Sequence, residues 1–81
     1  MDPPDPILVD ARGHRCPVPA LRLRRALETA ADGARVRLLA DDPLALIDVP
    51  LLLRELNYSL ENQSKIGSAL IFDIVKRAVG P

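Results

Sequence analysis

The first third of the chain shows a short apolar run typical of a strand and then the three-to-four-residue period of a helix. Residues 7–9 form a β-branched-rich run that predicts a short strand. Further along, Leu23 and Leu27 recur with alanines at spacings of three and four, which predicts a helix over residues 20–31. We expect Gly33 to end this helix as a left-handed C-cap.

The middle of the chain repeats the same order of strand and helix. Val36 and Leu38 alternate with arginines, which predicts a half-buried second strand over residues 34–40. Residues 44–56 carry apolar side chains at helical spacing and predict a second helix. Pro50 lies within it. Because proline lacks the N–H that a helix interior needs, we expect Pro50 to kink the helix or split it into two pieces.

The last third predicts two strands joined by a turn. Residues 58–63 alternate weakly, residues 65–68 predict the turn, and residues 69–76 form a strongly apolar final strand. The order β-α-β-α-β-β predicts an α+β fold, a two-layer α/β sandwich in which two helices cover one face of a four-stranded mixed sheet. We expect a single domain over residues 7–78, preceded by a flexible lead-in at residues 1–6.

Composition and charge exclude some classes of function. At 81 residues with 48% hydrophobic residues, the chain is long enough for one small folded domain. The 11 Lys and Arg residues balance 11 Asp and Glu residues, so no overall positive charge attracts nucleic acid or an anionic membrane. Aromatic residues, on which proteins stack single-stranded bases, are limited to one Tyr and one Phe. Direct binding of nucleic acid is therefore not expected.

The cysteine content bears on the compartment. Cys16 is the only cysteine, so an internal disulfide is excluded. The N-terminal stretch lacks the charged and apolar regions of a secretory signal, and the longest apolar run is far shorter than a bilayer span. We therefore expect the protein to be cytoplasmic, where thiols stay reduced.

The residues around Cys16 predict a reactive thiol at the start of the first helix. Pro17 and Pro19 fall where the N–H groups of a helix have no partner within it, so they mark the helix start and stiffen the loop. The positive end of the helix dipole there favours a thiolate over a thiol. Arg12 and Arg15 either lower the thiol pKa further, bind an acidic partner or are simply solvated. We expect Cys16 to be the nucleophile.

Further residues are predicted to shape this loop and the second helix. Gly13 supplies a backbone conformation closed to other residues, and Asp10 is expected to hold the loop by accepting hydrogen bonds from nearby N–H groups. Asp42 and Asp48 are predicted to be helix caps, Asp42 at the start of the second helix and Asp48 at its second piece. His14, two residues before the thiol, is either a proton shuttle or a surface histidine.

Three blocks of residues resemble the TusA family of small sulfur-carrier proteins, also called the SirA or YedF-like family. The first block is Val9-Asp10-Ala11-Arg12-Gly13-x-Arg15-Cys16-Pro17-x-Pro19, in which a Cys-Pro-x-Pro element opens the first helix. The second is Ala40-Asp41-Asp42-Pro43 with Asp48-Val49-Pro50, and the third is Phe72-x-Ile74-x-Lys76. Spaced matches in the expected order over about residues 8–76 are more specific than one short motif.

The resemblance implies that Cys16 accepts sulfane sulfur as a persulfide and transfers it to a partner protein. It implies cysteine desulfurases or rhodanese-type proteins as donors, and acceptors that lead toward tRNA thiolation, molybdenum cofactor maturation or sulfur oxidation. It implies no metal and no organic cofactor, and such a carrier would work as a monomer. Leu53 stands where many relatives have a second cysteine, which leaves no resolving thiol.

Two other hypotheses remain open. The chain is alternatively a non-enzymatic regulatory or interaction module that binds a partner through the arginines of its first helix, Arg22 and Arg25. Replacing Cys16 would then leave its function intact. RNA binding through the same basic face is a weaker alternative, because the net charge is neutral and aromatic residues are scarce.

Overall fold

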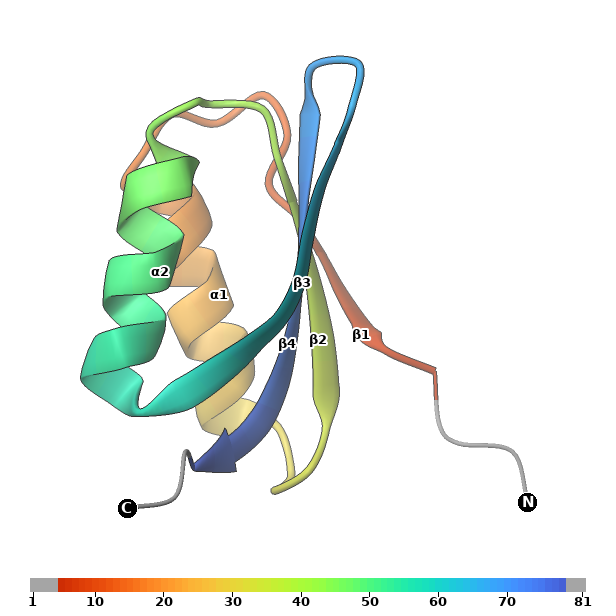
Figure 1. The fold of residues 1–81 in the computed structure, drawn as a ribbon, viewed down its shortest axis with the longest axis vertical. Coiled ribbons are helices and arrows are strands. Elements are labelled where there is room, and N and C mark those ends of the chain that lie inside the picture. The colour runs from red at the N-terminus through yellow and green to blue at the C-terminus, as the bar shows by residue number, and fades with distance from the viewer. Residues whose placement is uncertain (1–4, 79–81) are drawn as a thin grey trace.

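The computed structural model describes residues 5–78, so most of the predicted lead-in at residues 1–6 lies outside the described residues. The elements are β1 (Ile7–Asp10), α1 (Val18–Thr29), β2 (Arg35–Ala40), α2 (Ala45–Leu56), β3 (Tyr58–Ile66) and β4 (Ala69–Ala78). The strands form one sheet in the order β1-β2-β4-β3, and both helices lie against the same face of it (Figure 1). The predicted α+β sandwich and its order of elements are confirmed.

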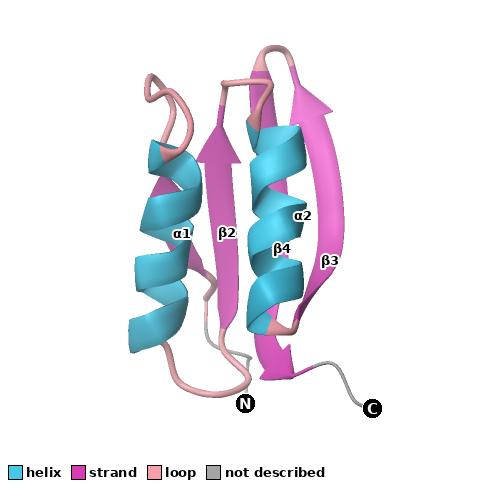
Figure 2. Ribbon diagram, turned by 90° about the vertical axis from the view of Figure 1, so that its left-hand side faces the viewer, coloured by secondary structure: helices cyan, strands magenta, loops and turns pink. Residues whose placement is uncertain are grey.

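The sheet is mixed because only its first pair of strands is parallel. β1 runs parallel to β2, with Val9 beside Leu38, whereas β2 and β3 both pair antiparallel with β4. Since the carboxyl ends of parallel neighbours meet at one edge, the loops that follow β1 and β2 begin side by side. Helices α1 and α2 both start at that end of the molecule (Figure 2).

An aliphatic core fills the space between the sheet and the helices. Its least exposed side chains, all at 1% or less, include Leu23, Leu27, Val36, Leu38 and Phe72. The alternation predicted for the second strand is confirmed, because the arginines of β2 are exposed on the opposite face. These residues supply the apolar burial that holds the two helices on the sheet.

Helix α1 ends earlier than predicted. Its last residue is Thr29, and Ala30 follows as a C-cap in an extended conformation. Gly33 therefore lies beyond the cap, and its φ of 85° serves the turn into β2 instead. The Lys76 Nζ donates a hydrogen bond to the Ala30 carbonyl at 2.7 Å, which satisfies one of the oxygens left free at the helix end. Among the described residues, neither helix is long and apolar enough to cross a membrane.

Pro50 does not divide α2, which is one unbroken helix. Val49 and Leu52, on either side of the proline, are buried in the core. Burying two such side chains contributes about 3–6 kcal/mol, whereas an interior proline costs about 3 kcal/mol. The prediction of two pieces is wrong for this reason, and so is the prediction that Asp48 caps the second piece. Asn57 ends the helix in the left-handed conformation, with a φ of 62°.

Replacement of Phe72 tests the described core. Phe72 is fully buried, and we predict that Phe72→Ala lowers the free energy of unfolding by about 3–5 kcal/mol, measured by urea denaturation. Leu51→Ala is the matched control, because Leu51 is 50% exposed on α2 and its loss should change stability by less than about 1 kcal/mol. Equal effects of the two substitutions would contradict this core.

Candidate functional site around Cys16

Cys16 lies in the loop between β1 and α1, directly before the helix. Pro17 is the N-cap residue and Pro19 lies in the first turn, where it is buried. The prediction that these prolines mark the helix start is confirmed, although the helix begins at Val18, two residues earlier than predicted. The Cys16–Pro17 peptide bond is cis. Proline at 17 and 19 leaves the first turn with fewer N–H donors than a helix start ordinarily has.

Asp42 joins the Cys16 loop to the loop that precedes α2. Its Oδ2 accepts a hydrogen bond from the Cys16 N–H at 2.9 Å, and its Oδ1 accepts one from the Leu44 N–H at 3.0 Å. These two backbone donors, Leu44 first, hold the pKa of the Asp42 carboxyl below its ordinary value. The N-cap position of α2 belongs to Leu44, which makes no side-chain cap bond. Asp42 thus lies two residues before the assigned N-cap, but it makes the predicted capping bond at the start of the helix, to the Leu44 N–H, while its second oxygen is bonded across to Cys16.

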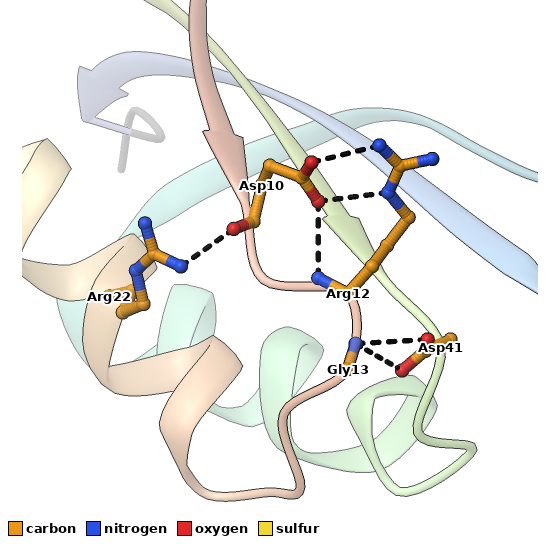
Figure 3. Close-up of polar contacts among 5 residues, drawn as sticks. All are labelled: Asp10, Arg12, Gly13, Arg22 and Asp41. Carbon is orange, nitrogen blue, oxygen red and sulfur yellow. Dashed lines mark hydrogen bonds and ion pairs between the residues drawn. The ribbon is translucent and has the colours of Figure 1, made fainter.

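Asp41 makes a second connection between the same two loops. Both of its carboxylate oxygens accept from the Gly13 N–H at 3.0 Å (Figure 3). Gly13 has a φ of 83°, a left-handed conformation that favours glycine, so the predicted role of Gly13 is confirmed. Together, the two aspartates bond the backbone of the Cys16 loop at two points, three residues apart.

Asp10 holds the start of this loop together with Arg12. The Arg12 Nε and Nη2 donate to the Asp10 carboxylate at 2.9 and 2.8 Å, and the Arg12 N–H donates to it at 3.2 Å (Figure 3). The side-chain hydrogen bond from Arg12 lowers the pKa of Asp10 to about 2. The Asp10 carbonyl also accepts from Arg22 of α1 at 2.6 Å. The prediction that Asp10 fixes the loop is confirmed, while the Arg12 guanidinium is bonded to Asp10.

The Cys16 thiol itself is half-buried and packs against the core. Burial and then the carboxylate of Asp48, in the first turn of α2, raise the pKa of the thiol to about 11, and the negative charge of Asp42 adds to the effect. The prediction of a helix end that favours the thiolate is therefore wrong. The positive charge of Arg15 instead helps to lower the pKa of Asp42.

An open hollow adjoins the Cys16 loop. Its lining residues are Gly13, His14, Arg15, Asp41, Asp42, Pro43 and Leu44. His14 is exposed, and its backbone N–H donates to the Ala11 carbonyl at 3.3 Å. The contacts described within residues 5–78 include no hydrogen bond from His14 to Cys16, so a proton-shuttle role stays a prediction. No group of three or more His, Cys, Asp and Glu residues in the same range is arranged to hold a metal ion.

Inspection of the sequence misses two functions of aspartates at this site. Asp41 accepts a hydrogen bond from Gly13, and Asp48 helps to raise the pKa of the thiol, although neither function follows from the local motif. A topological signal exists for the first contact. In a β-α-β unit with adjacent parallel strands, the residues directly after both strands share one edge of the sheet. Asp41 follows β2 directly, as the Cys16 loop follows β1.

Comparison with known proteins gives consistent similarities. The model of the family described as sulfurtransferase TusA matches residues 7–76. A putative sulfur carrier protein of Archaeoglobus fulgidus is 37% identical over 68 residues, covering 84% of this chain and 88% of that protein. The sulfur carrier protein TusA of Pseudomonas putida is 32% identical over 75 residues, covering 93% and 92%. The crystal structure of a SirA-like protein from Desulfitobacterium hafniense superposes with a TM-score of 0.75 at 28% identity, covering 85% of this chain and 95% of that one.

Loss of the Asp42 carboxylate should loosen the Cys16 loop. We predict that Asp42→Ala accelerates hydrogen exchange of the Cys16 amide by about tenfold, since that N–H loses its acceptor. Because the fold lowers the pKa of Asp42, its stabilising effect is present above the pKa of an unfolded aspartate and disappears as the pH falls through the lowered value. The stability difference between wild type and variant should therefore shrink below about pH 4. Asp32→Ala, in an exposed turn, is the control.

The raised pKa of Cys16 predicts slow alkylation at neutral pH. A thiol with a pKa of about 11 is protonated at pH 7, so its reaction with iodoacetamide should accelerate about tenfold per pH unit from pH 7 to 10 without a plateau. The chain unfolded in urea is the internal control, because the alkylation rate of its cysteine should level off above about pH 8.5. A plateau below pH 8 in the folded protein would show that the thiol is activated instead.

Proposed function

The chain belongs to the sulfurtransferase TusA family, and from this premise we propose that it is a sulfur carrier that accepts sulfane sulfur as a persulfide on Cys16. The observation that carries the proposal is the placement of this thiol. Cys16 is only half-buried, its backbone N–H is bonded to Asp42, and His14 and Arg15 directly before it line an open hollow. A buried structural cysteine would have no route to a donor protein.

The transfer chemistry requires little beyond an accessible sulfur. The Cys16 thiolate attacks the terminal sulfur of a donor persulfide, a new S–S bond forms, and the S–S bond of the donor breaks. The electron pair of the broken bond goes to the donor sulfur, which takes up the proton that Cys16 has lost. Delivery is the same reaction in reverse direction, with an acceptor thiolate attacking the terminal sulfur on Cys16. No metal or organic cofactor enters either step.

Sulfur transfer in this domain involves one cysteine, so each step needs a second protein. Cys16 is the only cysteine in the chain, and Leu53 occupies a buried position in α2. The proposed partners are a donor, either a cysteine desulfurase or a rhodanese-type protein, and an acceptor in a sulfur relay. The proposed pathways are tRNA thiolation, molybdenum cofactor maturation and sulfur oxidation. A persulfide carrier also needs a reduced thiol, which supports the cytoplasm as its compartment.

Incubation with a donor tests the proposal directly. We predict that the protein, mixed with a cysteine desulfurase and cysteine, gains one sulfur atom by intact-protein mass spectrometry. The adduct should vanish on treatment with dithiothreitol and be missing from Cys16→Ser. Absence of the adduct with desulfurase and with rhodanese-type donors would refute persulfide loading.

Variants of the same protein distinguish the carrier proposal from the interaction-module hypothesis. Arg25→Glu reverses a charge on the exposed face of α1 without a described contact to Cys16, and under the carrier proposal it should load sulfur like the wild type. Under the interaction hypothesis, Cys16→Ser keeps the biological function while the charge reversal removes it. Growth complementation with both variants distinguishes the two hypotheses.

A further inference from the structure

Helix α2 exposes a row of large aliphatic side chains on its side away from the sheet. Leu44, Ile47 and Leu51 are 55%, 59% and 50% exposed, although the same helix buries Val49 in the core. Spacings of three and four residues place the three exposed side chains on one face of the helix. In the part of the chain that the structure describes, no other element lies over this face (Figure 2). We call these three residues the α2 stripe.

Both ends of the α2 stripe carry one positive and one negative side chain. At the start of the helix, Asp41 and Arg15 line the open hollow together with Leu44. At its end, Arg54 and Glu55 are both exposed. Among the described residues, Arg15, Arg54 and Glu55 form no ion pair. A row of aliphatic side chains with charges at its ends is typical of a contact surface, whereas single exposed leucines are ordinary.

Two copies of this chain complement each other if their α2 helices pack antiparallel about a two-fold axis. Such an axis gives both copies the same contact surface. An axis that passes between Ile47 and Leu51 places Ile47 of each copy beside Leu51 of the other. It also places Leu44 of each copy beside the turn of the other that carries Glu55. The aliphatic row of one copy is then covered along its whole length by that of the other.

The charged ends favour this antiparallel pair over a parallel one. In the antiparallel pair, Arg54 and Glu55 of one copy approach the end of the other copy that carries Asp41 and Arg15, so each charge faces an end that holds the opposite charge. A parallel pair would bring each charged side chain beside its counterpart in the other copy, where like charges repel. The helix dipoles also attract in the antiparallel pair and repel in the parallel one.

We propose that the α2 stripe is the contact between two copies of this chain in a weak, reversible, antiparallel homodimer. The size of the stripe sets the strength of the contact. With three aliphatic side chains from each copy, the interface is smaller than the total of about 1,200 Å² below which protein contacts are transient. The monomer therefore predominates in dilute solution. Because Leu44 also lines the hollow beside the Cys16 loop, the second copy lies against one wall of that hollow.

Sedimentation equilibrium of the full chain tests the proposal, in a reducing buffer that excludes a disulfide between two Cys16 thiols. The mean mass should rise from that of the monomer at about 10 µM toward that of the dimer at about 1 mM. Ile47→Lys should weaken the association by about tenfold or more, because it places a charge within the aliphatic contact. Leu21→Lys is the matched control, since Leu21 is 58% exposed on α1, outside the α2 stripe, and its replacement should leave the association unchanged. Leu51→Lys gives a second variant of the stripe, and circular dichroism identifies which variants are folded.

Disulfide cross-linking in a Cys16→Ser background tests the orientation of the two helices. A mixture of Leu44→Cys and Glu55→Cys chains should form the mixed disulfide faster than either chain forms a disulfide with itself, as measured by intact-protein mass spectrometry. A chain that stays monomeric at 1 mM, an equal effect of the lysine substitutions in α1 and α2, or faster pairing of Leu44→Cys chains with one another overturns the proposal. If the chain stays monomeric and Ile47→Lys instead slows sulfur loading from a cysteine desulfurase, the stripe binds the donor protein and the homodimer is refuted, while the carrier function stands.

Discussion

The site depends on hydrogen bonds that the backbone N–H groups of Gly13 and Cys16 donate to the carboxylates of Asp41 and Asp42. A loop that enters a helix through two prolines has few backbone partners of its own. Carboxylates from the next loop supply them, and such charge-assisted bonds are stronger than neutral ones. They form only because β1 and β2 are parallel neighbours, which brings the ends of both strands together. The position of Cys16 is thus a consequence of sheet topology.

The groups that position Cys16 also determine its acidity. The dipole at a helix N-terminus stabilises an adjacent anion by about 0.3–1 kcal/mol, which is less than one pKa unit. Burial and two nearby carboxylates act in the opposite direction and raise the thiol pKa from 9.0 to about 11. The arginines close in sequence do not compensate, because Arg12 is bonded to Asp10 and Arg15 acts on Asp42. The arginines that lie near Cys16 in the sequence therefore suggest a positive surrounding, whereas the charges that act on the thiol are negative.

The fold could be predicted from the sequence largely because its elements are strongly periodic. The alternation around Val36 and Leu38 and the helical spacing of Leu23 and Leu27 are local signals of burial. Pro50 misled the prediction, because tertiary packing outweighs a local preference there. Within the candidate site, the position of Cys16 directly before the first helix was predictable from its motif. Its carboxylate partners lie 26 or more residues away, and their contacts depend on strand pairing that no local pattern specifies.

A thiol with a pKa of about 11 is ionised in only about one molecule in ten thousand at pH 7. A self-sufficient nucleophilic site would hold its cysteine as a thiolate, with a neighbouring base or cation to do so. Asp42, one of the carboxylates that disfavour the thiolate, lines an open hollow beside the Cys16 loop, together with Asp41 and Arg15. A partner that places positive charge in that hollow would bind both aspartates and offset the charge of Asp42 on the thiol. Docking and activation of Cys16 then become the same event.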